Sequence, residues 1–162
     1  MTGDVFLDPG TAGTTAAILV ARTGPKTRLA LDEYYHIGDE MGRLTDDEHL
    51  RRLRTRKGWA IQRLIVDPES ANMRAQAGQM GFDVTQARNE FNEGVQITNH
   101  ALYSGAMTIH ERCQNLIDES ASYIWNITEE RPMAGVPDHL MDCLRYACRK
   151  YWPAYRAMLL AR

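Results

Sequence analysis

The sequence predicts an α/β fold, a mixed central β-sheet (an antiparallel three-strand meander plus parallel strands) flanked by helices. Three features predict it. Three strand-like apolar runs open the chain with only short turns between them, strands then alternate with helical segments, and a helix rich in carboxylates comes last. With 162 residues, 44% of them hydrophobic, the chain has room for one packed domain and is short for two.

The first three strands account for the meander. The first, residues 5–7, ends in Asp8-Pro9-Gly10, because Pro-Gly stops a strand and turns the chain. Residues 14–22 and 28–36 follow as a hairpin, joined by a Thr-Gly-Pro-Lys turn. Residues 37–44 contain two glycines, and we expect a loop there.

Helices and further strands alternate after the meander. Thr45 and Glu48 have the spacing of a capping box, which predicts a helix over residues 46–57. A strand at 63–66 ends in Asp67, and the next helix closes at Gly81. The remaining expected elements are that helix at 71–80, strands at 82–87 and 107–109, helices at 93–104 and 111–125, a connector at 127–137, a final helix from Asp138 to at least residue 150, and a short helical tail to residue 162.

Charge and cysteine content limit the classes of function. There are 19 basic and 21 acidic residues, a net charge of −2, so the chain has no overall basic surface for nucleic acid. The three cysteines lack a Cys-x-x-Cys spacing, which indicates reduced thiols and no zinc site. No signal peptide and no membrane-spanning run is found in the sequence, so we expect a soluble intracellular protein with no membrane partner.

The helix at 46–57 carries a dense basic run, Arg51, Arg52, Arg54, Arg56 and Lys57, which has two interpretations. It is either a solvated helix face or a patch that contacts phosphate. For a DNA backbone, the candidate contacts in this run and beyond it are Arg51, Arg52, Arg54 and Arg88.

Carboxylates recur at the ends of buried segments. A lone Asp-Pro-Gly most often caps its own turn, but Asp8 is matched by Asp67, which again ends an apolar run before proline. Asp138, His139 and Asp142 are three and four residues apart, so they can share one face of a first helical turn. Buried carboxylates are costly unless they are paired or bind metal, and their recurrence therefore favours a site.

Carboxylates on separate elements suit metal-dependent phosphodiester hydrolysis. Two divalent ions about 3.5–4 Å apart can activate water, stabilise the leaving oxygen and neutralise charge. Mg²⁺ and Mn²⁺ both prefer oxygen ligands. In this interpretation Asp8 bridges the two ions, while Asp67 and Asp142 each hold one.

The order of these motifs resembles the nuclease domain of bacteriophage large terminase subunits, which has the RNase H-like fold shared with Holliday-junction resolvases. The resemblance covers nearly the whole chain. The segments that carry it are Asp8-Pro9-Gly10-Thr11, Leu31-Asp32-Glu33-Tyr34-Tyr35-His36, Val66-Asp67-Pro68, and residues 138–146, where Cys143 replaces the usual Ala.

The resemblance implies an endonuclease that uses two Mg²⁺ or Mn²⁺ ions to cut concatemeric viral double-stranded DNA during genome packaging, with little sequence specificity. It places the catalytic, metal-binding carboxylates on Asp8, Asp67 and Asp142, with Asp138 or His139 as a further ligand or to orient a water. Its implied partners are an ATPase motor domain of the same polypeptide, the small terminase subunit and the portal, in the cytoplasm of an infected bacterial host.

The ATPase motor has no counterpart in this sequence, which lacks the G-x-x-x-x-G-K-[ST] phosphate loop. We therefore expect residues 1–162 to be a single RNase H-like nuclease domain excised from a longer chain.

Two other interpretations stay open. Asp-x-Gly-Thr followed by threonines also resembles the first phosphate loop of actin-like and sugar-kinase ATPases, although these need a second half that 162 residues do not provide. Alternatively, the chain is a non-catalytic DNA-binding or partner-binding module with a degenerate site. Its carboxylates would then serve turns and helix caps, as Asp138 would do by capping the final helix.

Overall fold

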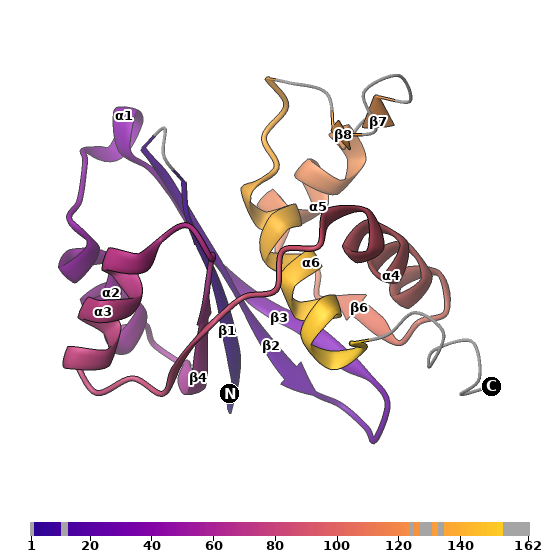
Figure 1. The fold of residues 1–162 in the computed structure, drawn as a ribbon, viewed down its shortest axis with the longest axis horizontal. Coiled ribbons are helices and arrows are strands. Elements are labelled where there is room, and N and C mark those ends of the chain that lie inside the picture. The colour runs from indigo at the N-terminus through magenta and orange to yellow at the C-terminus, as the bar shows by residue number, and fades with distance from the viewer. Residues whose placement is uncertain (1, 11–12, 124, 127–130, 133–134, 154–162) are drawn as a thin grey trace.

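Helices cover both faces of a six-stranded sheet in the structure of the protein, a computed structural model (Figure 1). The structure describes residues 2–10, 13–123, 125–126, 131–132 and 135–153. The expected helical tail, Thr11 of the first motif, and residues 127–130 and 133–134 of the expected connector lie outside the described residues.

The sheet contains the predicted meander. Its strand order is β5-β4-β1-β2-β3-β6, with antiparallel pairing between β1 and β2 and between β2 and β3. The other three pairings, β1 with β4, β4 with β5 and β3 with β6, are parallel. The strands are β1 (Thr2–Pro9), β2 (Thr14–Arg22), β3 (Arg28–Ile37), β4 (Ala60–Val66), β5 (Val84–Gln86) and β6 (Met107–Ile109).

Each face of the sheet has its own apolar core. Alternation along β1 sends Phe6 to one core, while Val5 and Leu7 enter the other. Helices α2 (Asp46–Thr55) and α3 (Ala71–Gln79) cover the Val5 face. Helices α4 (Phe91–Tyr103), α5 (Gln114–Ser122) and α6 (His139–Tyr151) cover the Phe6 face. Because both faces are covered, β2 is a nearly continuous apolar run, and the three successive apolar residues of β1 are all buried.

Two short elements differ from expectation. The segment expected as a loop begins with one helical turn, α1 (Gly38–Met41). The helix expected over 111–125 is shorter, because α5 ends at Ser122 and Trp125 belongs to a two-stranded ribbon of β7 (Trp125–Asn126) and β8 (Arg131–Pro132). Two-residue strands are too short for sequence periodicity to reveal.

The two helix starts that we expected to be capped locally differ. Thr45 and Glu48 form the predicted capping box of α2. Asp138 stands at the N-cap position of α6, but its side chain makes no cap hydrogen bond, so the expectation that it caps the helix is wrong. Glu119 of α5 does this instead, since its Oε2 accepts hydrogen bonds from the backbone N–H groups of Leu140 (2.8 Å) and Met141 (3.0 Å).

The remaining expectations concern thiols and membranes. All three cysteines are buried and unpaired, and no group of three His, Cys, Asp or Glu side chains within the described ranges is arranged to hold a metal ion. In the same part of the chain, no helix has the length and apolar character needed to cross a bilayer.

Candidate active site

Asp8 lies at the end of β1, where the strand gives way to the Pro-Gly turn. It pairs with Ala16 of β2 and is only 9% exposed. The turn packs closely against α6, because a Cβ added at Gly10 would lie 2.6 Å from Cε1 of His139. Glycine at this position therefore lets the start of α6 approach the Asp8 carboxylate.

Asp67 follows β4 and lies beside the end of β1. Its backbone N–H donates to the carbonyl of Leu7 over 2.9 Å, which continues the parallel pairing of the two strands. Its Oδ1 accepts a hydrogen bond from the N–H of Glu69 (2.8 Å), and its Oδ2 accepts one from the hydroxyl of Tyr146 on α6. The predicted alignment of Asp8 and Asp67 at one end of the sheet is thus present.

His139 brings α6 to the same place. Its Nδ1 lies 2.9 Å from Oδ2 of Asp8. This hydrogen bond raises the pKa of His139 more than burial lowers it. The helix is held against β2 one turn later, where Sγ of Cys143 donates to the carbonyl of Ala16 (3.5 Å). The His139 side chain is therefore a direct partner of Asp8.

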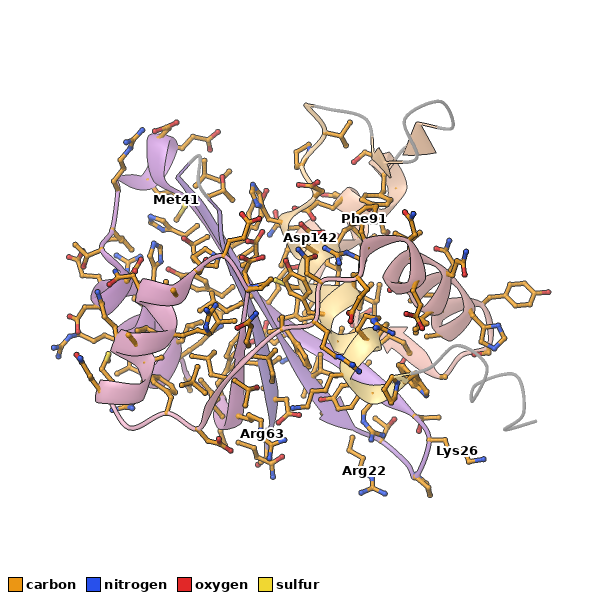
Figure 2. All side chains as sticks on the ribbon, viewed as in Figure 1. Arg22, Lys26, Met41, Arg63, Phe91 and Asp142 are labelled. Atoms are coloured by element: carbon orange, nitrogen blue, oxygen red, sulfur yellow. The ribbon has the colours of Figure 1, made fainter. Side chains whose placement is uncertain are left out.

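Asp142 projects from the first turn of α6, toward the start of α4 near Phe91 (Figure 2). Its Oδ1 accepts a hydrogen bond from Nη2 of Arg145 (2.9 Å). Burial raises the pKa of Asp142 to about 6, and the nearby charges of Asp138 and Asp8 add to the rise that Arg145 opposes. Asp142 is therefore close enough to Asp8 for their charges to interact.

Arg145 is fixed in place on four sides. It is 4% exposed, donates to Oδ1 of Asn89 (2.9 Å), and lies over the rings of Phe91 and Tyr146, at 4.7 and 4.9 Å from their centroids. The sequence motifs assign no role to Arg145 or Tyr146. Their spacing of three and four residues from Asp142 on one helix was the available signal.

Glu119 is the third residue of the site that the sequence did not indicate. It is 4% exposed, and burial raises the pKa of its carboxyl to about 7 despite the two hydrogen bonds from α6. It holds the turn that carries His139 and Asp142. No local sequence pattern identifies such a contact, because the two residues come together only when α5 and α6 pack.

The expected metal ligands are near one another but do not form a ready metal-binding group. Asp8, Asp67 and Asp142 instead have separate partners, His139, Tyr146 and Arg145. The donor chemistry nevertheless fits a hard divalent ion, since these are carboxylate oxygens on three packed elements. The raised pKa of Asp142 also reflects repulsion between carboxylates that a cation would relieve. Arg145 contacts only Oδ1 of Asp142, so Oδ2 could serve a metal while that contact is kept.

The four arginines proposed for DNA contact do not form one patch. Arg51 pairs with Asp47 over 2.7 Å, and Arg54 donates to the carbonyl of Met80 and stacks on a phenylalanine ring. Arg88 lies 3.9 Å from a carboxylate oxygen of Glu90, close to α4. Arg52 faces a cavity beside β3.

No protein-family model and no curated protein matches this sequence. Among solved structures, the large terminase from a thermophilic bacteriophage in complex with ATP-gamma-S is similar, with a TM-score of 0.81 and 24% identity over 90% of this chain. A second structure of that large terminase gives a TM-score of 0.77 at 23% identity. This chain spans 38% of the length of the terminase chain in both structures.

A shorter protein matches over nearly its full length. The nuclease domain of g2p, the large terminase of bacteriophage SPP1, with bound Mn, has a TM-score of 0.61 and 16% identity, over 91% of this chain and 86% of that domain. The class that fold and topology define is an α/β protein with a mixed six-stranded sheet. Within that class, the chain has the RNase H-like fold of the terminase nuclease domain, as predicted.

Proposed function

We propose that this chain is a divalent-metal-dependent DNA endonuclease that cuts phosphodiester bonds with little sequence specificity, in the manner of a phage genome-packaging nuclease. The observation that carries the proposal is the meeting of Asp8, Asp67, His139 and Asp142 at one end of the sheet. The similarity to the SPP1 nuclease domain with bound Mn supports the same class. The proposed setting is the cytoplasm of an infected bacterium, with an ATPase motor, a small terminase subunit and a portal as partners.

The chain's own residues would orient the ligands. His139 fixes Oδ2 of Asp8, while the Glu69 N–H and the Tyr146 hydroxyl fix both oxygens of Asp67. Arg145 holds Oδ1 of Asp142 and would leave Oδ2 available for a metal. Such fixed partners reduce the reorganisation needed when substrate binds.

Asp8, Asp67 and Asp142 would hold two Mg²⁺ or Mn²⁺ ions, which supply Lewis acidity and activate water. Asp138 lies close enough to influence the pKa of Asp142, so it stays a candidate auxiliary group. His139 would either remain a hydrogen-bond partner of Asp8 or orient the attacking water. In both roles its ring must stay next to Asp8.

The test is cleavage of supercoiled plasmid with Mn²⁺, with Mg²⁺ and with EDTA. We expect cleavage only with metal, and a loss of more than about a hundredfold in Asp8→Asn, since misplacing a metal removes several kcal/mol of transition-state stabilisation. Asp83→Asn is the matched control, because Asp83 is a surface carboxylate paired with Arg63.

Calorimetric titration with Mn²⁺ provides a readout that does not depend on cleavage. Heat of binding in the wild type and its loss in Asp8→Asn would support the metal site. Cleavage by Asp8→Asn at the wild-type rate would contradict the proposal. A folded protein that neither binds Mn²⁺ nor cuts DNA would favour the non-catalytic binding module.

A further inference from the structure

A cavity of about 600 Å³ lies along the outer edge of β3, outside the candidate active site. It is bounded by the C-terminal half of α2 and by the segment that leads into α5. Strand β6 pairs only with residues 28–30, so the second half of β3 has no neighbouring strand on this side among the described residues. We call this cavity the β3-edge pocket. Its basic lining residues are Arg52, Arg56, Lys57 and Arg112.

The acidic residues of the β3-edge pocket are already hydrogen-bonded within the protein. The carboxylate of Glu33 accepts from the backbone N–H groups of Asn115 (2.8 Å) and Leu116 (2.9 Å). Asp32 accepts from Nε1 of Trp59 (2.7 Å) and lies 3.6 Å from the guanidinium of Arg56. Within the described chain, only one of the four cations is therefore balanced by a carboxylate of the pocket.

Arg52, Lys57 and Arg112 have no carboxylate partner in the part of the chain that the structure describes. Some exposed arginines elsewhere do have one, as in the pairs of Arg43 with Asp39 and of Arg51 with Asp47. Three cations without an ion pair around one concave surface attract an anion more strongly than the same charges spread over a convex face.

Two buried nitrogen atoms at the pocket also lack partners. Nε of Arg56 and Nδ1 of His36 have no hydrogen-bond partner among the described residues. His36 is 1% exposed, and its Nε2 faces the carbonyl of Gly42 at 2.7 Å, so Nε2 carries a proton. A buried N–H without an acceptor is costly. An anionic oxygen beside the Arg56 guanidinium would supply such an acceptor.

The sheet register relates the β3-edge pocket to Asp8. Asp8 pairs with Ala16 of β2, and Ala16 pairs with Tyr35 of β3, which lines the pocket. Two strand spacings separate Asp8 from Tyr35, about 10 Å between backbones. Each DNA strand carries a phosphate about every 3.4 Å along the helix axis. If one phosphate of a duplex lies at Asp8, other phosphates of the same duplex therefore lie about as far from Asp8 as the β3-edge pocket does.

We propose that the β3-edge pocket binds a backbone phosphate of the DNA duplex that crosses the candidate active site, upstream or downstream of the phosphate to be cut. This assignment rests on the proposed nuclease function. It selects Arg52 from the basic run of α2 and adds Arg112, which lies far away in sequence. The pocket would position the duplex without reading its sequence, because phosphate contacts carry no base information.

The experiment is binding of a fluorescent DNA duplex of mixed sequence, measured by anisotropy at several salt concentrations with Ca²⁺ in place of the catalytic ion. The variant is Arg52→Gln/Arg112→Gln. The matched control is Arg22→Gln, an exposed arginine at the opposite end of the sheet from Met41, which lines the pocket (Figure 2). Plasmid cleavage and thermal unfolding are recorded for each protein.

The proposal predicts that the double variant binds DNA at least about tenfold more weakly at low salt, with the slope of log K against log salt reduced by about 2, while Arg22→Gln matches the wild type. Equal binding by double variant and wild type, with metal-dependent cleavage intact, would overturn the pocket assignment and leave the nuclease proposal standing. Loss of binding in Arg51→Gln equal to that in Arg52→Gln would also overturn it, because the helix face and not the pocket would be responsible.

Free phosphate distinguishes the source of the anion. If inorganic phosphate or a nucleotide binds at the pocket at millimolar concentration while DNA binding ignores Arg52 and Arg112, the pocket is a small-anion site and the DNA assignment is overturned. If the wild type binds no DNA and Mn²⁺ supports no cleavage, the nuclease proposal itself fails, and the assignment fails with it.

Discussion

The starts of α2 and α6 satisfy the same physical requirement in different ways. Thr45 and Glu48 cap α2 within one turn of sequence, and both are exposed. The first N–H groups of α6 are instead accepted by Glu119, which comes from α5 and is buried. The first four N–H groups of any helix need partners. In α2 the local chain provides partners, whereas in α6 a distant carboxylate does.

The difference follows from what each first turn carries. The first three residues of α2 are acidic, which suits the positive end of a helix. The first turn of α6 bears His139 and Asp142, whose side chains point to Asp8 and Arg145. Because Glu119 caps α6 from another helix, His139 and Asp142 remain available for the candidate active site. The position of α5 therefore affects the geometry of that site.

Glu119→Ala should have the largest effect of the substitutions that test this comparison. It leaves two backbone N–H groups of α6 without their acceptor, which we expect to cost about 2 kcal/mol of unfolding free energy. The shifted helix start should lower the proposed nuclease activity by up to about a hundredfold, because positioning errors near 1 Å have effects of that size. Urea unfolding and plasmid cleavage measure the two quantities.

Glu119→Gln is the matched control, because its amide oxygen can replace the single carboxylate oxygen that accepts both hydrogen bonds. We expect it to retain most of the stability and activity that Glu119→Ala loses. Equal activity in Glu119→Ala and the wild type would mean that other contacts hold the start of α6. The way in which α6 is capped would then have no effect on function.

The same pair of proteins gives a pH-dependent effect, smaller than that of truncation. Burial raises the pKa of Glu119 from 4.5 to about 7, so between these pH values the folded state binds more protons than the unfolded state. Its contribution to stability is fully present below pH 4.5 and is lost as pH rises through about 7. Glu119→Gln has no such loss.

Unfolding in urea at about pH 4.5, 6 and 7.5 measures this. Asp142, whose pKa is also raised, loses stability in the same direction in both proteins and cancels in the difference. The charge of Glu119 contributes to the raised pKa of His139, so the pH-dependent contribution of His139 is smaller in Glu119→Gln. Stability of Glu119→Gln relative to the wild type should therefore increase with pH. Parallel curves for the two proteins would show that burial of Glu119 does not raise its pKa.

The comparison also explains how much the sequence could predict. The meander, the cap of α2, and Asp8 and Asp67 at neighbouring strand ends were all predicted, because strand periodicity, turn residues and capping boxes are local patterns. The role of Glu119 could not be predicted, because Glu119 is on α5 and the N–H groups that it caps are on α6. The capping role was therefore wrongly given to Asp138, the residue that stands next to those N–H groups in the sequence. The split of the basic run, with Arg52 in a pocket and Arg51 on a solvated face, likewise depends on how α2 packs.

Thr45→Ala should have a moderate effect that is confined to stability. It removes the side chain that accepts from the Glu48 N–H, and loss of such a cap costs about 1 kcal/mol. The free energy of unfolding should fall by that amount, while cleavage per folded molecule stays unchanged. Thr45→Ser keeps the hydroxyl and serves as the control. A large loss of activity in Thr45→Ala would show that the two helix starts are not functionally distinct.

Asp138→Ala should have the smallest effect on stability, although Asp138 occupies the position where a cap normally stands. Its side chain makes no cap hydrogen bond, and its charge raises the pKa values of Glu119 and Asp142, so removing it relieves repulsion. We expect a change within about 0.5 kcal/mol, the range of substitutions that remove no specific contact. Urea unfolding measures it, with Asp138→Asn as the variant that keeps the shape.

Destabilisation of about 1 kcal/mol in Asp138→Ala, the usual cost of losing a cap, would show that Asp138 does cap α6 and that α6 is capped locally, as α2 is. If stability is unchanged but Mn²⁺ affinity falls, Asp138 serves the metal site and not the helix.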